Sequence, residues 1–305
     1  MAITTRVQDR RGGAGKDLGI RKRPVVRAIR DGIQILGLVF LALLPLATAS
    51  AEDRLPIFDC HLHYSEDAWA SFPAEEVIST IRAAGVIGIL ASSSPDDGTV
   101  RLLEAAPDLV TPELRPYRAG VSSATWHGDA ETPAYLRERL AQRAYVGIGE
   151  FHLHAVEDAR SATVRDAVAL AVERDIHLHV HADAPEIRTL LKINPEVRIL
   201  WAHAGMVTPP DQIRAVMQAH PNVSAELSYR EDQILGDGTI DPHWKRLFLD
   251  FPDRFVVGSD TWAPGRWPIY AAIIDDHRAY LKQLPRSLAE KIAFRNAQRM
   301  FRTAN

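Results

Sequence analysis

Two histidines two positions apart are the strongest chemical signal in this sequence. His61 and His63 follow a short apolar run, in the segment Asp-Cys-His-Leu-His at 59–63. Side chains two apart on a β-strand point to the same face, and imidazole is a common ligand of divalent metals. The pair could therefore supply half of a metal site, although two histidines alone are more typical of a hydrogen-bonded polar pair.

Further side chains of metal-ligand type stand at the ends of later apolar runs, namely Glu150, His181, His203 and Asp260. Any one of them has a structural explanation, as a helix cap or as a hydrogen-bonded core residue. Six such groups at the ends of five predicted strands are difficult to explain by packing. The sequence therefore predicts a metal centre.

The elements that position these side chains follow a repeating pattern. Short runs rich in Val, Ile and Leu alternate with segments of helical period, which predicts βα units. The predicted strands are 57–60, 86–91, 117–121, 145–150, 176–181, 198–203, 222–227 and 255–260. The predicted helices are 73–84, 99–109, 132–143, 161–174, 185–192, 209–219, 242–251, 268–281 and 284–301. Eight units in roughly 250 residues favour an α/β fold closed into a (β/α)8 TIM barrel over an open doubly wound sheet.

Position along a strand selects among neighbouring histidines. Active sites of such barrels lie at the C-terminal ends of the strands. Of His177, His179 and His181, which share one face, only His181 ends its strand, whereas His177 belongs near the barrel floor and His179 is intermediate. By the same argument Glu150 is the predicted ligand of the fourth strand, and His152 is predicted to reach the substrate.

Together these motifs resemble the amidohydrolase superfamily of metal-dependent barrels. The matching segments are Asp-Cys-His-Leu-His (59–63), Gly-Glu (149–150), His-Val-His-Ala-Asp (179–183), Trp-Ala-His-Ala-Gly (201–205) and Gly-Ser-Asp-Thr (258–261). One lies on each expected strand, so the resemblance spans nearly all of the chain beyond the leader described below. It favours the compact branches, including the TatD-like hydrolases, which lack a flanking β-sandwich.

The resemblance implies a role for each ligand. His61, His63 and Asp260 would bind a metal, His181 and His203 would complete that site or a second one, and Asp260 would handle the proton of the attacking water. Many members with two metals place a carboxylated lysine on strand four, where this chain has none. Glu150 could bridge instead, so one and two ions both remain open. The predicted cofactor is Zn²⁺, with Mn²⁺ or another divalent ion as alternatives.

The predicted reaction is hydrolysis of an amide, ester, lactone or related bond in a small molecule by metal-activated water. Asp260 and His203 are the predicted catalytic residues. The predicted substrate contacts are His127, His152 and Arg230, with Arg230 facing an anionic group. Two alternatives stay open: a metal-dependent decarboxylase of an unsaturated or aromatic acid, and a periplasmic metal- or ligand-binding barrel without catalysis.

The first 51 residues have the composition of an export signal. Residues 1–32 contain nine Lys or Arg against three Asp, and the uncharged stretch 33–47 follows. That stretch is shorter than the roughly 20 residues of a bilayer span, and Ala49-Ser50-Ala51 offers a small-x-small cleavage site. We predict cleavage after Ala51, a periplasmic or secreted protein, and one hydrolase domain over 52–305. An uncleaved anchor or a misassigned start is the alternative.

The charge of the chain argues against nucleic acid as a partner. The leader carries +6 and the whole chain −3, so residues 52–305 carry about −9. Phosphate backbones are bound by clustered Lys and Arg, which disfavours a TatD-like nuclease. We expect a small-molecule substrate and no stable membrane span after cleavage. The only cysteine, Cys60, excludes an intramolecular disulfide.

Overall fold

The structure is a computed structural model and describes residues 54–301. The predicted leader and its cleavage site after Ala51 lie outside the described residues. Among the helices of residues 54–301, none combines the length and the apolar character that crossing a bilayer requires.

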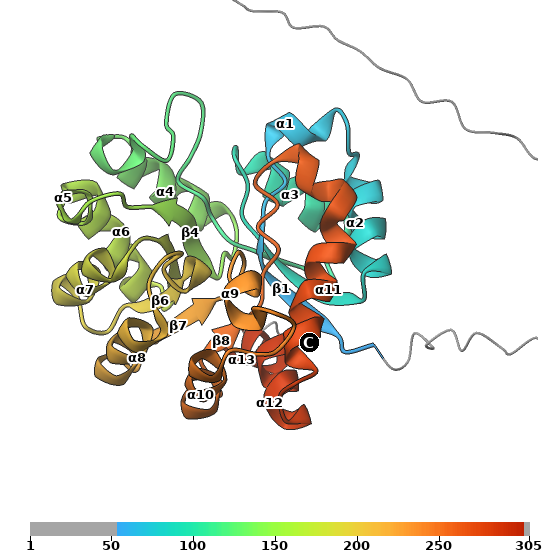
Figure 1. The fold of residues 1–305 in the computed structure, drawn as a ribbon. Helices are drawn as coiled ribbons and strands as arrows, with labels where there is room; N and C mark the ends of the chain where they lie inside the picture. Colours follow the sequence, from blue (N-terminus) through green and yellow to red (C-terminus); the bar gives the residue numbers. More distant parts are fainter. Residues whose placement is uncertain (1–53, 302–305) are drawn as a thin grey trace, which may run out of the picture. The chain divides into compact units, whose positions relative to one another are not determined.

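Eight strands with parallel pairing form the centre of the fold, and helices surround them (Figure 1). One ladder contains β1 (Ile57–Leu62), β2 (Val86–Ala91) and β3 (Val110–Pro112). The other contains β4 (Gly147–His152), β5 (His177–His181), β6 (Arg198–Trp201), β7 (Val223–Glu226) and β8 (Phe255–Val256). Isolated parallel bridges join Leu114 to Ile148 and Asp59 to Val257 across the two seams. Parallel strands alternating with helices confirm the predicted α/β class, and the two bridges lie where a (β/α)8 barrel closes.

The outer helices return the chain from one strand to the next. The longer ones are α2 (Ala74–Ala83), α3 (Asp97–Ala105), α4 (Thr132–Gln142), α6 (Ala162–Glu173), α7 (Ala184–Ile193), α8 (Pro210–Ala219), α10 (Pro242–Asp250) and α11 (Tyr270–Leu281). Proline occupies the first turn of four of them, where its missing N–H costs nothing. At α10 the Asp241 side chain also accepts hydrogen bonds from the first-turn N–H groups of His243 and Trp244.

Shorter elements fill the connections and the C-terminal end. They are α1 (Glu66–Trp69), α5 (Val156–Ala159), α9 (Glu231–Leu235) and the 3₁₀ turns η2 (Trp126–Gly128), η3 (Ala202–Ala204) and η4 (Pro264–Ile269). The predicted last helix consists of α12 (Arg286–Glu290), the π-helical turn η5 (Lys291–Arg295) and α13 (Asn296–Phe301).

The prediction of the third strand was wrong. β3 is Val110–Pro112, and the predicted strand 117–121 instead forms a turn with an antiparallel bridge between Arg118 and Val121. Gly120 in this turn has φ of 79°, which a strand does not use. The true strand has three residues and ends in proline, so it lacks the longer apolar run that reveals a strand in sequence. The segment after β3 is consequently a loop.

Candidate metal centre

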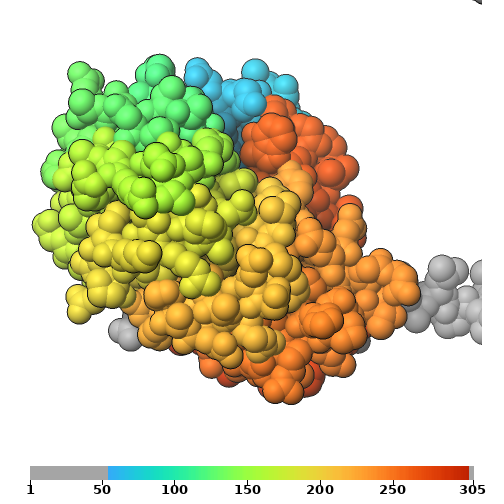
Figure 2. Space-filling model, turned by 60° about the vertical axis from the view of Figure 1, so that its left-hand side comes forward, coloured from blue at the N-terminus to red at the C-terminus, as the bar shows by residue number. Residues whose placement is uncertain are grey.

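A cavity of about 1030 Å³ opens at the C-terminal ends of the strands. Glu150, His181 and Asp260 line its base, and the loop after β3 supplies much of its wall. In Figure 2 the blue segment with α1, the green segment after β3 and the orange-red segment with η4 gather along the upper part of one face. All three segments contribute residues to the cavity.

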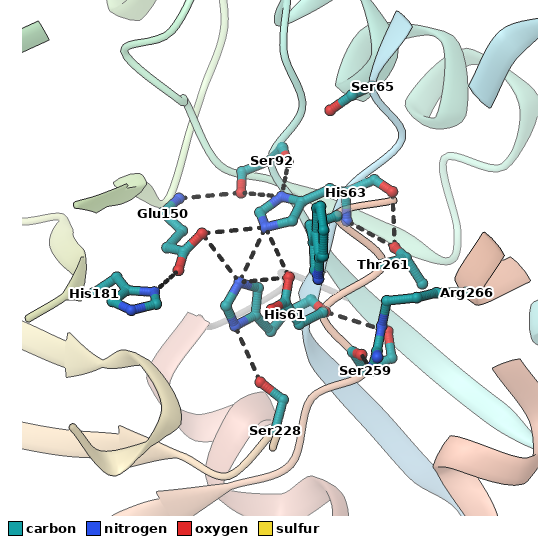
Figure 3. Close-up of polar contacts among 12 residues, drawn as sticks. His61, His63, Ser65, Ser92, Glu150, His181, Ser228, Ser259, Thr261 and Arg266 are labelled. Carbon is teal, nitrogen blue, oxygen red and sulfur yellow. Dashed lines mark hydrogen bonds and ion pairs between the residues drawn. The ribbon is translucent and has the colours of Figure 1, made fainter. Parts of the chain in front are cut away.

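Four donor atoms converge below this cavity, as Figure 3 shows for His61, His63 and Glu150. The Nε2 atoms of His61 and His63 are 3.0 Å apart. Each lies 3.3–3.5 Å from Glu150 Oε2 and from Asp260 Oδ1. Ligand atoms around a tetrahedral Zn²⁺ with bonds of 2.0–2.1 Å are roughly 3.3 Å apart, so the spacing fits a divalent ion.

The hydrogen bonds of the two imidazoles support the same conclusion. His61 Nδ1 lies 2.9 Å from Glu226 Oε2, and His63 Nδ1 contacts the carbonyl oxygen of Ser92. Both partners only accept hydrogen bonds, so each ring carries hydrogen on Nδ1 and directs an Nε2 lone pair to the centre. Asp260 Oδ1 is also buried there without a hydrogen-bond partner. Facing lone pairs and carboxylates require a cation, and these residues therefore fit a metal.

A second donor set shares Glu150 with the first. Glu150 Oε1 lies 2.9 Å from His181 Nδ1 and 3.4 Å from His203 Nε2, and these two nitrogens are 3.1 Å apart. His203 Nδ1 lies 2.8 Å from the hydroxyl of Ser228, and near its carbonyl oxygen, which leaves Nε2 as an electron-pair donor. The two oxygens of Glu150 thus face two separate donor sets. The structure brings all six predicted ligands together.

The charges around the first set favour a cation. Burial alone lowers the pKa of His61, but Asp260, Glu150 and Glu226 outweigh it and raise this pKa well above its usual value. Burial raises the pKa of Glu226, yet the charge of His61 and a hydrogen bond from it lower the pKa to about 2. Glu226 is therefore ionised and has no exposed surface. It stabilises a positive charge on the His61 ring or on a cation at the Nε2 of that ring.

Two of the ligands lie on turns beyond their strands. β6 ends at Trp201 and β8 at Val256, short of the predicted ends at residues 203 and 260. His203 has φ of 53° and Asp260 has φ of 47°, in the left-handed region that costs an L-residue roughly 1–2 kcal/mol. Gly205, two residues after His203, is required, because a Cβ there would lie 2.4 Å from the Trp201 ring. Strain at the ligand turns is typical of a functional site.

Carboxylates that the sequence analysis did not select hold the histidines in place. Glu226 near the end of β7 contacts His61, and Glu113 lies 2.5 Å from His177 Nε2 and 3.0 Å from His179 Nδ1. A glutamate inside the predicted strand 222–227 was the available signal for Glu226. Asp59, the first residue of the Asp-Cys-His-Leu-His segment, accepts hydrogen bonds from Ser259 and Tyr270.

Two of the three predicted substrate contacts lie away from the cavity. Arg230 has no exposed surface, and its guanidinium donates to the carbonyl oxygens of Met206 and Thr208 and stacks 4.7 Å from the Trp244 ring. Its donors are therefore unavailable to a substrate, which corrects the prediction. His127 lies in η2 and contacts the Ala124 carbonyl oxygen at 3.1 Å, outside the cavity lining. His152 does line the cavity.

Arg230 is expected to stabilise the turn that carries His203. Burial lowers the pKa of Arg230 to about 10, so the side chain stays charged at neutral pH while it binds the carbonyls of residues 206 and 208. Arg230→Met should lower the free energy of unfolding by about 2–3 kcal/mol, because two buried acceptors lose a charged donor. Urea denaturation measures this loss. The exposed control Arg246→Met should change stability by less than about 0.5 kcal/mol, and equal effects of both variants would refute the assignment.

The sequence matches the amidohydrolase family over residues 58–303. The chain belongs to the amidohydrolase family. A comparison with curated proteins gave no match.

Solved structures with the same fold include several amidohydrolases. A probable 2-pyrone-4,6-dicarboxylic acid hydrolase of Acinetobacter baumannii, with citric acid bound, has a TM-score of 0.58 at 14% identity, covering 80% of this chain and 98% of its own. An amidohydrolase of Burkholderia multivorans with bound HEPES gives 0.53 at 16% identity, covering 81% and 99%. 5-Carboxyvanillate decarboxylase of Sphingomonas paucimobilis gives 0.54 at 11% identity, covering 82% and 99%.

Family membership and the donor sets together identify this amidohydrolase as an enzyme with candidate ligands for a divalent metal. The family model spans all but the first four of the described residues, from Phe58 in β1 to the end of α13. The identities to the solved structures are low, so these neighbours establish the barrel and leave the reaction to be argued from the site.

Proposed function

We propose that this amidohydrolase is a metal-dependent hydrolase that cleaves an amide, ester, lactone or related bond of a small molecule. The observation that carries the proposal is the convergence of His61, His63, Glu150 and Asp260 at 3.0–3.5 Å beneath an open cavity. We propose Zn²⁺ as the resident ion, and Glu150, His181 and His203 would hold a second ion where one is bound. A divalent ion bound there supplies Lewis acidity, which polarises a substrate oxygen and acidifies water.

The side chains of the site have distinct tasks in this proposal. Asp260 borders the cavity and has one oxygen without a hydrogen-bond partner, so it accepts the proton of the attacking water and returns it to the leaving group. Burial raises the pKa of Asp260, but His61 and His63 outweigh this and keep the pKa below its usual value. The carboxylate is therefore ionised and ready to accept a proton at neutral pH.

The neighbouring groups keep the site rigid. Glu226 fixes the ring of His61, and Ser228 fixes the ring of His203. The Ser92 hydroxyl accepts the backbone N–H of Glu150, while its carbonyl oxygen holds His63. Donor atoms that are already oriented need no reorganisation when the reaction begins, which is a major source of catalytic rate.

Decarboxylation of an unsaturated or aromatic acid is the second candidate, favoured by the structural similarity to 5-carboxyvanillate decarboxylase. In that reaction the bond from carbon to the carboxylate breaks and the same carbon receives a proton. Asp260 is again the group placed to transfer the proton. The two reactions would thus use the same donor set but differ in whether water enters the product.

A substrate panel distinguishes these reactions. Protein purified from expression of the full chain is reconstituted with Zn²⁺, Mn²⁺ or Co²⁺ and assayed on lactones, esters, amides, phosphoesters and aromatic acids in ¹⁸O-labelled water. Hydrolysis incorporates the label into the organic product, whereas decarboxylation releases CO₂ and leaves the organic product without label. Stoichiometric metal binding without turnover on any class would instead favour a non-catalytic binding barrel, and absence of metal binding would refute the proposal.

We also propose that the protein is exported and that its leader is cleaved after Ala51. The proposal is supported by the charge pattern of residues 1–51 and by the small-x-small site at their end. Intact-mass measurement of protein from the periplasm or medium should give a chain beginning at Glu52. A full-length mass in the membrane fraction would support an uncleaved anchor and contradict the proposal.

A further inference from the structure

One wall of the cavity is built from Arg115, Tyr117 and His152. The first two lie in the loop after β3, and His152 ends β4. The Tyr117 hydroxyl accepts the backbone N–H of His152 at 2.7 Å and lies 2.9 Å from Nδ1 of the same residue. The His152 ring stacks on His181, with ring centroids 4.1 Å apart and planes at 22°. His152 is therefore held by two neighbours.

These contacts fix which nitrogen of His152 carries hydrogen. The Tyr117 hydroxyl already accepts one hydrogen bond, and the acceptor for its own hydrogen among the described residues is His152 Nδ1. With Nδ1 accepting, the neutral ring carries its hydrogen on Nε2. No residue of the range 54–301 forms a hydrogen bond with Nε2, so this N–H donor is available to a ligand of the cavity.

Arg115 supplies a second donor beside it. Its Nε and Nη2 atoms donate to the backbone oxygen and to Oε2 of Glu150 at 2.9 and 2.8 Å, which fixes the guanidinium. The third nitrogen, Nη1, has no acceptor within the described part of the chain, and the residue lines the cavity. A fixed cation with one free donor can bind an acceptor without losing further side-chain entropy.

The other wall adds a third donor. The hydroxyl of Tyr229 accepts the indole N–H of Trp262 at 2.6 Å, which leaves its own hydrogen free to donate. Of the four acidic side chains of the cavity, Glu66 and Asp67 lie exposed at the rim, where water screens their charge, and Glu150 and Asp260 belong to the metal donors. The cavity wall thus offers free hydrogen-bond donors and two arginines, Arg115 and Arg118, of which Arg118 is already paired with Asp129 and Thr132.

We propose that Arg115 and His152 form a subsite for a carboxylate of the substrate, in which Tyr117 acts as a positioning residue that sets the His152 tautomer. The inference rests on the proposed function for its location, because the reacting bond would lie at the metal donors and the carboxylate beside them. A carboxylate only accepts hydrogen bonds, and each donor can bind one of its oxygens. A carboxamide in the same place would direct N–H hydrogens at one of these donors.

Equilibrium binding tests the subsite without turnover. The probes are benzene-1,3-dicarboxylate and 3-carbamoylbenzoate, which share one carboxylate that is free to occupy the metal and differ only in the second group. Isothermal titration calorimetry of the metal-loaded protein should show at least about 10-fold tighter binding of the dicarboxylate, the effect of one charge-assisted hydrogen bond. Equal affinities, or no binding of either probe, would overturn the inference.

Variants separate tautomer control from simple packing. In Tyr117→Phe the ring of His152 is free to move its hydrogen to Nδ1 and to accept from an amide, so the preference should fall to within about 3-fold. His152→Gln keeps an N–H donor and should retain part of the preference, whereas His152→Phe should lose it. Tyr135→Phe, a tyrosine outside the cavity lining, is the matched control and should behave as wild type.

The outcomes distinguish the subsite from the reaction. Metal content, measured for every variant, must equal that of wild type for a loss of preference to count as evidence. A Tyr117→Phe protein that keeps its metal and its full carboxylate preference would overturn the positioning role. Preference for the dicarboxylate without turnover on any substrate would leave the subsite standing and refute the hydrolase proposal.

Discussion

Asp260→Asn is expected to lower kcat by at least about 1,000-fold, within the range that positioned acid–base groups contribute. The substitution keeps the shape of the side chain but removes the ability to accept a proton at neutral pH. Asp260 Oδ1 lies 3.3 Å from His63 Nε2 and 3.5 Å from His61 Nε2, so the carboxylate touches the centre of the donor set. Steady-state kinetics on a substrate found in the panel measures the loss.

The same variant should remain folded, because Asn occupies the volume of Asp and removes a buried charge. Circular dichroism and metal analysis check the fold and the remaining ligands. Asp67→Asn, at the exposed cavity rim, is the control and should keep kcat within about 3-fold of wild type, as expected of an exposed surface position. Retention of more than about a tenth of the wild-type kcat by Asp260→Asn would remove the proton-transfer role from this residue.

Metal loading is expected to raise the melting temperature by roughly 8–16 °C. Free metal at 1,000 times its Kd stabilises the folded state by about 4 kcal/mol, and 1 kcal/mol shifts the melting point of a domain of this size by about 2–4 °C. The structure gives the reason, since buried Asp260, Glu150 and Glu226 surround His61 and repel one another without a cation. Differential scanning calorimetry of chelated and reconstituted protein measures the shift.

Ligand variants show whether the shift comes from this site. His63→Gln should lose most of it, because one of four converging donors is removed. His243→Gln, an exposed histidine on α10, should keep all of it. An equal shift in both variants would place the metal elsewhere, and no shift with Zn²⁺, Mn²⁺ or Co²⁺ would contradict a metal centre in this cavity.

Local patterns were sufficient for the fold and for the types of the candidate ligands. Apolar runs alternating with segments of helical period predicted the barrel. The spacing of apolar residues within each βα unit is sufficient to indicate which face of its strand or helix is buried. The same patterns were insufficient for β3, whose three residues resemble any short apolar stretch. The error mattered, because the loop that replaces the predicted strand carries Arg115 and Tyr117 into the cavity wall.

Arg230 illustrates a different limit. A cation after the seventh strand was a reasonable candidate for an anionic substrate group, but its acceptors are the backbone oxygens of Met206 and Thr208. Those oxygens belong to the turn after β6, which has positive φ at His203, Ala204 and Met206. Backbone conformation of this kind leaves no sign in the periodicity of the sequence.

The sequence by itself determined the barrel, the order of the candidate ligands along it and the alternation that puts His61 and His63 on one face. Only the tertiary structure decided the hydrogen-bond partners of those ligands. Glu226 reaches His61 across 165 positions of the chain, and Arg115 reaches Glu150 across 35. The physical reason is that strand periodicity is a property of neighbouring residues, whereas a hydrogen bond between distant segments exists only after the barrel has closed around it.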